Sequence, residues 1–371
     1  MQKKQFAVID IGSAKITALI GERGVNGTFV IKARKEFVYD GYSEARFFDV
    51  AGVKQILFSA AEFLSAGSRT PFTTVYVGVP GAFTEVFVKE SQISFPAKKK
   101  IDISDVNRLL DAAFVKRSVN SVLINHSAIV YELNDYRRFA DPVGAESEIL
   151  KGKLSFITCD NYFMETVKNT LVALGFNTVE CVSVALSEAL YLLEPETRDR
   201  VAMLADVGHI ATTFSLIQGD GILFQKNFDY GGGYISAEIS RRLDTDFDTA
   251  EQLKRKVNFS ASGDGAREII RLQDGQCFDA EEVRQAIRES IDGFCGDISE
   301  AMEDSGYAIP DYVPLTVTGG GISYLRGAKE RISDRLGCAV EIVAPKVPLM
   351  DEPTESSVLS VLELAISNEG E

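Results

Sequence analysis

Two stretches far apart in the chain each combine a carboxylate with a glycine turn. In residues 6–22, FAVIDIGSAKITALIGE, an apolar strand ends at Asp10, and a turn formed by Gly12, Ser13, Ala14 and Lys15 leads into a second apolar strand. Such a turn directs several backbone N–H groups and one cation toward a single point, which suits a phosphate. The carboxylate at the strand end suits a hydrated metal ion. A single Asp-x-Gly pair is equally consistent with an ordinary hairpin turn.

The second stretch repeats the first about half a chain later. Residues 203–217, MLADVGHIATTFSLI, again contain a strand, an aspartate (Asp206), a glycine (Gly208) and a second strand. A third strand in residues 315–321, LTVTGGG, ends in Gly319, Gly320 and Gly321 before a helix-like segment. Two such hairpins and a late strand-GGG-helix unit predict an α/β protein in which two similar domains face one nucleotide.

Length and composition restrict the class of protein. A chain of 371 residues with 45% hydrophobic and 25% charged residues predicts two to three globular domains. A net charge of −15 argues against nucleic-acid binding and against electrostatic attraction to anionic lipid. We find no run of about 20 apolar residues and no signal-peptide pattern, so we expect a cytoplasmic protein. His126 and His209 are the only histidines, too few for a histidine-based metal site.

Periodicity and turn residues predict the remaining elements. In the first half we expect helices at 50–64, 160–174 and 184–193 and a buried strand at 74–79. Between them lies a small α+β unit, with strands at 84–89, 92–95, 121–133 and 152–158 and a helix at 104–115 capped by Ser104. In the second half we expect a strand at 222–228, helices at 234–243, 249–256, 281–304, 324–336 and 355–366, and a strand at 340–342. The apolar stripe of 281–304 predicts core packing.

The motifs resemble those of a known superfamily. DIGSAK at 10–15 is similar to the first phosphate motif, and TGGG at 318–321 to the adenosine motif, of the actin, Hsp70 and sugar-kinase superfamily. Narrower matches point to the bacterial actin-like ATPases, and within them to the FtsA family of cell-division proteins. These matches are YVGVPG at 76–81 followed by an insertion ending in DPVG at 141–144, YGGGYIS at 230–236, and AEQLK at 250–254. The resemblance spans about residues 6–366.

The resemblance implies an actin-like (ribonuclease H-like) fold with duplicated domains facing a nucleotide cleft. The first domain would comprise 1–81, 160–198 and 346–371, interrupted by an inserted small α+β subdomain (SHS2-type) at 82–159. The second would comprise 199–345, with 234–312 as its smaller subdomain.

The resemblance also implies ATP and Mg²⁺ as cofactors and assigns the site. Asp10 and Asp206 would hold the metal through water. The nucleotide would be bound by Gly12, Ser13, Ala14, Lys15, Gly208, Gly232, Glu251, Lys254, Gly319, Gly320 and Gly321. For Glu251 and Lys254, an exposed charged helix face is an equally good explanation. No residue stands out as catalytic.

The second hairpin departs from the family pattern. The family commonly continues Asp-x-Gly-Gly-Gly-Thr-x-Asp, whereas this chain has His209 and Ile210 in place of two glycines, Ala211 for Thr, and Thr213 for Asp. Glycine permits a close backbone approach and a positive φ that a β-branched residue resists. We therefore expect nucleotide binding without efficient hydrolysis, so that the chain is at most a weak ATPase. His209 could donate to a phosphate oxygen, but we favour a turn residue that packs locally.

The sequence thus predicts an FtsA-like scaffold that binds ATP, forms homo-oligomers or filaments and recruits bacterial division proteins, above all the tubulin-like ring protein. The family usually ends in a linker and a basic amphipathic helix. Here we assign 355–366 to the core, so no direct membrane anchor is evident and recruitment to the membrane would require a partner.

Two alternatives to this function are an adaptor of the type IV pilus assembly kind and a sugar or acid kinase. The kinase would need an aspartate base, for which we find no candidate.

Overall fold

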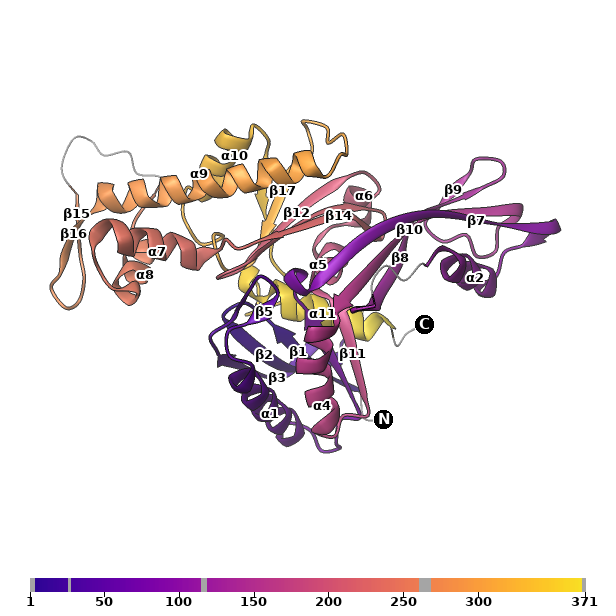
Figure 1. The fold of residues 1–371 in the computed structure, drawn as a ribbon, viewed down its shortest axis with the longest axis horizontal. Coiled ribbons are helices and arrows are strands. Elements are labelled where there is room, and N and C mark those ends of the chain that lie inside the picture. Colours follow the sequence, from indigo (N-terminus) through magenta and orange to yellow (C-terminus); the bar gives the residue numbers. More distant parts are fainter. Residues whose placement is uncertain (1–3, 26–27, 115–118, 260–267, 369–371) are drawn as a thin grey trace.

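The computed structural model describes residues 4–25, 28–114, 119–259 and 268–368. Two five-stranded sheets within these ranges form the centres of two lobes (Figure 1). The first sheet has the order β11 (Thr178–Ser183), β6 (Thr74–Val79), β1 (Gln5–Ile11), β2 (Lys15–Arg23) and β3 (Phe29–Val38). The second has the order β14 (Gly221–Phe228), β13 (Thr212–Gln218), β12 (Ala202–Val207), β17 (Leu315–Thr318) and β18 (Val340–Ile342).

The two sheets share one topology. In each, a central strand pairs antiparallel with the next strand in sequence and parallel with a later one: β1 with β2 and β6, and β12 with β13 and β17. The central strands are apolar on both faces. Ala7, Ile9 and Ile11 point into one core, whereas Phe6 and Val8 point into another. This repetition confirms the predicted α/β fold with duplicated domains.

Helices cover both faces of the first sheet. One face packs on α1 (Val50–Ala66) and on a second helical segment; α5 (Val184–Leu192) and α11 (Ser356–Asn368) cover the other. The second segment was predicted as one helix at 160–174, and it consists of α3 (Asn161–Phe163), a π-helical turn (Met164–Lys168) and α4 (Asn169–Ala173). Shorter elements are β4 (Tyr42–Ser43), β5 (Arg46–Phe47), 3₁₀ turns at Gly81–Phe83 and Pro353–Glu355, and α6 (Pro195–Arg198).

A third, antiparallel sheet forms an arm on the right of Figure 1, with the order β7 (Thr84–Lys100), β10 (Glu146–Asp160), β8 (Ser121–Leu133) and β9 (Arg138–Phe139) and with α2 (Ile103–Ala113) packed on it. Two short strands predicted at 84–89 and 92–95 are instead the single strand β7, because β10 pairs along its whole length. The Ser104 cap is also wrong. Asp102 caps α2 in a capping box with Asp105, and Val115, the predicted helix end, lies outside the described residues.

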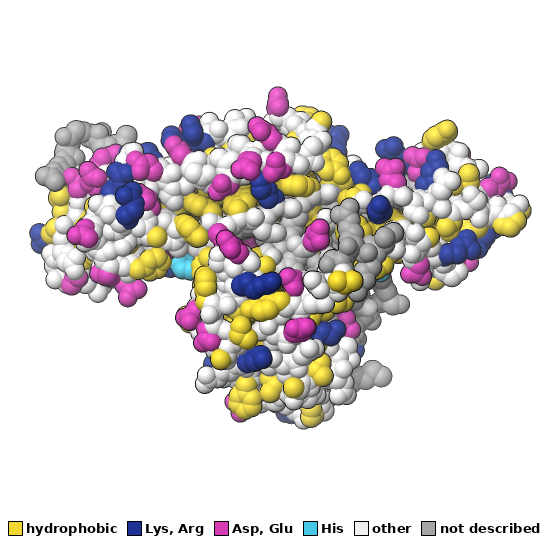
Figure 2. Space-filling view, viewed as in Figure 1, with side chains coloured by type: hydrophobic (Ala, Val, Ile, Leu, Met, Phe, Trp, Pro, Cys, Tyr) yellow, Lys and Arg dark blue, Asp and Glu magenta, His cyan; other side chains and the backbone are white. Residues whose placement is uncertain are grey.

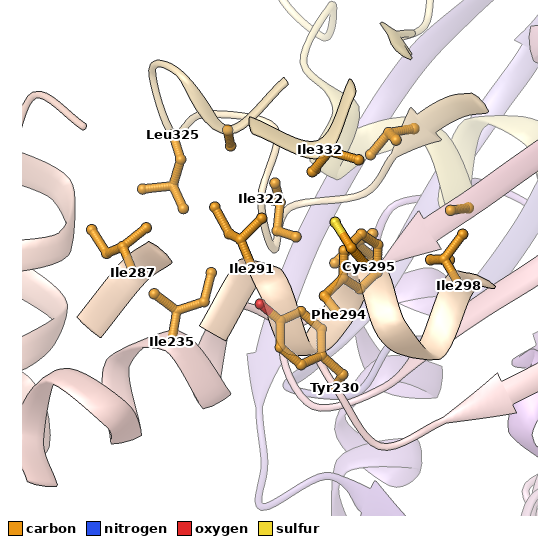
Figure 3. Close-up of a cluster of buried hydrophobic side chains, with 14 of the residues drawn as sticks. Tyr230, Ile235, Ile287, Ile291, Phe294, Cys295, Ile298, Ile322, Leu325 and Ile332 are labelled. Carbon is orange, nitrogen blue, oxygen red and sulfur yellow. The ribbon is translucent and has the colours of Figure 1, made fainter. Parts of the chain in front are cut away.

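The opposite arm contains α7 (Gly232–Leu243), α8 (Phe247–Lys256), α9 (Ala280–Asp304) and the hairpin of β15 (Ile269–Arg271) with β16 (Cys277–Asp279). The apolar stripe of α9 packs against Ile235 of α7 and against Ile322, Leu325 and Ile332 (Figure 3), which confirms its predicted core role. The helix predicted at 324–336 is shorter: α10 begins at Ala328, because Gly327 before it has φ +95°.

The helix predicted at 355–366 belongs to the core. Helix α11 buries Val358, Leu359, Val361, Leu362 and Ala365 against the first sheet and α5. Across the described part of the chain, we find no helix that is long and apolar enough to span a membrane. On the face drawn in Figure 2, acidic and basic side chains are interspersed over both arms.

Candidate functional site

The two predicted aspartates meet in one cavity between the lobes. Asp10 lies near the end of β1, and Asp206 lies near the end of β12, the equivalent strand of the second lobe. The cavity has a volume of about 180 Å³. Both hairpin turns line it, as do residues of β17's glycine turn and of α5. The duplicated topology therefore places the two carboxylates at corresponding points of the two lobes.

The cavity also contains a carboxylate that sequence reasoning missed, Glu188 of α5. Its side chain is completely buried, and neither carboxylate oxygen has a hydrogen-bond partner in the structure. A charged residue in the otherwise uncharged helix VALSEALYL was the signal that could have revealed it. An unpaired buried carboxylate is costly, so a proton or a bound group must offset the charge of Glu188.

The pKa values of all three carboxyl groups are raised, in each case chiefly by burial. Burial raises the pKa of Asp10 to about 6, although Ser357 Oγ donates to Asp10 Oδ1 at 2.5 Å and opposes the shift. Burial and the charge of Asp10 raise the pKa of Asp206 to about 7. The pKa of Glu188 lies well above its usual range, first because of burial and then because of Asp206 and Asp10. Protons or a cation must neutralise this site.

The first turn forms where it was predicted, and the ammonium group of Lys15 in it already has partners. Gly12 N–H donates to Lys15 O at 2.9 Å, which closes the turn. Lys15 Nζ forms an ion pair with Glu36 of β3 and lies 3.4 Å from Thr354 Oγ1. The Lys15 side chain is 31% exposed and lines the cavity with Ser13 and Ala14, so it can exchange Glu36 for another anion.

The second turn is closed in the same way, by Gly208 N–H donating to Ala211 O at 3.0 Å. The ring of His209 contacts Phe247 edge-on, with 6.1 Å between ring centroids. Burial and the neighbouring Lys254 lower the pKa of His209. The imidazole therefore packs toward α8, and His209 also lines the cavity.

The remaining predicted residues form a second group beside the cavity. Lys254 Nζ donates to Gly232 O and to Glu251 Oε2, both at 2.6 Å, and the Lys254 residue is 2% exposed. The alternative of an exposed charged face is therefore wrong for Lys254. Ser236 Oγ also donates to Glu251 Oε2, at 2.6 Å, and the ring of Tyr324 lies 5.7 Å from Lys254 Nζ.

The glycine turn after β17 joins the two groups. Gly319 and Gly320 line the cavity, whereas Gly321 N–H donates to Val207 O at 2.7 Å. Gly319 has φ +85°, and a Cβ there would lie 2.4 Å from Asp206 Oδ1. Only glycine fits so close to the carboxylate. The structure thus brings all the predicted site residues to one region, with Gly232, Glu251, Lys254 and Gly321 outside the cavity lining.

The donor set suits a hydrated divalent cation and a phosphate group. Carboxylate oxygens are the ligands that Mg²⁺ prefers, and Mg²⁺ commonly keeps several of its waters. Backbone N–H groups of two turns and one lysine suit phosphate oxygens. Among residues 4–25, 28–114, 119–259 and 268–368, no three His, Cys, Asp or Glu side chains are placed to bind one metal ion together.

Comparisons with known proteins agree with this geometry. A family model described as type IV pilus assembly protein PilM matches residues 177–360. Cell division protein FtsA of Staphylococcus epidermidis is 22% identical over 381 aligned residues, which cover 99% of this chain and 80% of that protein. The solved PilM-PilN type IV pilus biogenesis complex matches with a TM-score of 0.66 at 17% identity, covering 98% of this chain and 99% of the other. MreB5 of Spiroplasma citri bound to ADP matches with a TM-score of 0.55 at 11% identity, covering 99% of this chain and 97% of the other.

The fold and the two facing hairpins define an actin-like ATPase fold. Within that class, the chain is similar to cell division protein FtsA along nearly its whole length, at 22% identity.

The raised carboxyl pKa values predict how stability depends on pH. A carboxyl whose pKa is higher in the folded state than in the unfolded state contributes stability below about pH 4, and this is lost as the pH rises through its folded pKa. The folded values here are about 6 for Asp10 and about 7 for Asp206. Between pH 5 and pH 8, the free energy of unfolding should fall by on the order of 1–3 kcal/mol from these groups.

Urea unfolding of the metal-free protein at both pH values measures this loss. Asp206→Asn should reduce it, whereas the matched variant Asp199→Asn, at an exposed position after α6, should leave it unchanged. An equal pH dependence in wild type and Asp206→Asn would contradict the assignment.

Proposed function

We propose that this protein binds ATP with Mg²⁺ in the cavity between its lobes and acts as an FtsA-like scaffold at the division site. The observation that carries the proposal is that Asp10, Glu188 and Asp206 line one cavity, where Asp10 and Glu188 are buried and Glu188 has no hydrogen-bond partner. A hydrated cation would offset the charge of the two aspartates, and the adjoining turns offer N–H groups for the phosphates of a nucleotide that would accompany it.

In this proposal the residues have distinct tasks. Asp10 and Asp206 accept hydrogen bonds from the water shell of Mg²⁺, which when bound would neutralise phosphate charge. Gly12, Ser13, Ala14, Lys15 and Gly208 surround the phosphates, and Lys15 exchanges Glu36 for a phosphate oxygen. The ribose and base are bound by Gly232, Glu251, Lys254, Gly319, Gly320 and Gly321.

Hydrolysis is weak in this proposal because one side of the phosphate cradle is altered. Ile210 stands where the resembling family has a glycine, and phosphoryl transfer depends on preorganised donors around the transferring group. Glu188 is the residue that can accept a hydrogen bond from, and so orient, an attacking water, because its carboxylate lines the same cavity as the two aspartates and is otherwise unpaired. ATP therefore acts mainly as a ligand that holds the two lobes together.

The lysine in the first turn gives a direct test. Lys15→Ala should weaken ATP–Mg²⁺ binding about tenfold or more in isothermal titration, because it removes the one cation of the turn. Lys346 also forms an ion pair with a glutamate, Glu194, but its side chain is 89% exposed. The control variant Lys346→Ala should therefore bind ATP–Mg²⁺ like wild type. Unchanged affinity in a folded Lys15→Ala variant would remove Lys15 from the site.

Glu188 gives a test that separates binding from turnover. Glu188→Gln keeps the size of the side chain and removes its charge, so ATP affinity should stay within about threefold while residual phosphate release falls at least tenfold. Wild-type release should itself be well below the roughly 1–100 per second typical of kinases. Release in that range, or unchanged release in Glu188→Gln, would contradict this assignment.

A pilus-assembly role is the second candidate, favoured by the PilM family match over residues 177–360. In both candidates we take the inserted subdomain, residues 82–159, to be a partner-binding element and the protein to self-assemble. Purified full chain should bind the tubulin-like ring protein of its own organism, and a fluorescent fusion should localise to midcell. Binding instead to a pilus protein of the PilN kind, with no midcell signal, would favour the adaptor.

A further inference from the structure

Ser13 of the first turn is bonded to the backbone of the second. Its Oγ accepts hydrogen bonds from the N–H groups of His209 and Ile210, both at 3.1 Å. Ser13 is 7% exposed. Two successive N–H groups converging on one oxygen form the arrangement that binds anions at backbone nests. The serine hydroxyl therefore occupies donors that would otherwise face a phosphate oxygen.

A side chain of the second lobe reinforces this contact. Ile210 Cδ1 lies 2.9 Å from the position that a Cβ on Gly41 would occupy, and Ser13 O lies 2.2 Å from the same position. Gly41 has φ +88°, so its backbone can pass between these two residues. Ile210 and Ser13 thus both pack against the backbone at Gly41.

Other polar contacts join the lobes independently of Ser13. Ser43 Oγ donates to Asp229 Oδ2 at 2.5 Å. The side chains of Asn227 and Gln225 donate to Gly81 O at 2.9 and 3.1 Å. The lobes are therefore held together at several points, and the bond from Ser13 is the one located at the phosphate-facing donors.

We propose that Ser13 is a built-in latch between the two hairpins. Its hydroxyl satisfies the His209 and Ile210 N–H groups and holds the lobes together, and a phosphate oxygen must displace it before that half of the site can be used. Opening of the latch then precedes binding and limits its rate. The displacement of Ser13 by a phosphate oxygen rests on the proposed nucleotide-binding function, whereas the contact between Ser13 and the second hairpin does not.

Hydrogen exchange of the nucleotide-free full-length protein tests the latch alone. The amides of His209 and Ile210 should exchange at least tenfold faster in Ser13→Ala than in wild type. The Gly208 amide, bonded to Ala211 O, serves as an internal reference and should not change. Ser43→Ala, which removes an inter-lobe bond elsewhere, is the matched control and should leave His209 and Ile210 protected.

Two further variants keep the test valid if Ser13→Ala folds poorly. Ser13→Cys retains the volume but is a weaker acceptor, so exchange should be intermediate. Ile210→Gly removes the packing over Gly41 and should also accelerate exchange. Unchanged exchange at His209 and Ile210 in the Ser13 variants, or equal acceleration in Ser43→Ala, would overturn the latch.

Stopped-flow binding of ATP with Mg²⁺ tests the second step. In wild type the observed rate should saturate with nucleotide concentration at the opening rate, and in Ser13→Ala the plateau should rise at least threefold. A linear dependence with the same slope in both proteins would overturn the rate-limiting role. If no variant binds ATP while exchange still responds to Ser13, the latch stands and the nucleotide-binding function fails.

Discussion

Three carboxyl groups share one buried cavity, and the rest of the molecule is arranged around that constraint. Asp10 and Asp206 are fixed by the ends of the two central strands, and α5 adds Glu188 from the first lobe. Burial of mutually repelling acids lowers stability, so the fold must supply compensating interactions elsewhere. It does so through the apolar cores on both faces of the first sheet and through α11, which packs against β1 and α5.

The duplication produces two hairpins that are similar in backbone and different in chemistry. Both turns are closed by the same hydrogen bond, from Gly12 to Lys15 in one and from Gly208 to Ala211 in the other. The first turn carries a lysine, whereas the second carries an imidazole that packs toward α8 and an isoleucine that packs toward Gly41. The second hairpin therefore contributes more to lobe contact than a glycine-rich turn would.

The inserted arm also connects the two lobes. Ser155 Oγ of β10 donates to Ile222 O of β14 at 2.8 Å, and a Cβ on Gly219 would lie 2.1 Å from Ile129 O of β8. The arm is part of the chain segment between elements of the first sheet, yet it contacts the β13–β14 hairpin of the second lobe. A change in the position of this arm would therefore bear on both lobes.

Local sequence patterns were enough to predict the fold class and the two aspartates that line the cavity. Apolar strands followed by Asp-x-Gly occur twice, and the apolar stripe of α9 has a helical period, so these features follow from short-range spacing. Element ends were less predictable. The continuity of β7 depends on pairing with β10, and the start of α2 depends on which of two nearby polar residues receives the backbone N–H groups.

Only the tertiary structure decided which side chains share the site. Glu188 lies 178 positions from Asp10 in sequence and has no motif of its own, and its place in the cavity follows from the packing of α5 beside the two aspartates. The burial of Lys254 depends on α8 docking against the start of α7, where Gly232 O receives its ammonium group. The bond from Ser13 to His209 and Ile210 joins residues of different lobes. The sequence by itself determined the strands, the turns and their acids, because those are properties of neighbouring residues. The partners across the cleft were decided by the fold, because they depend on how separate elements pack.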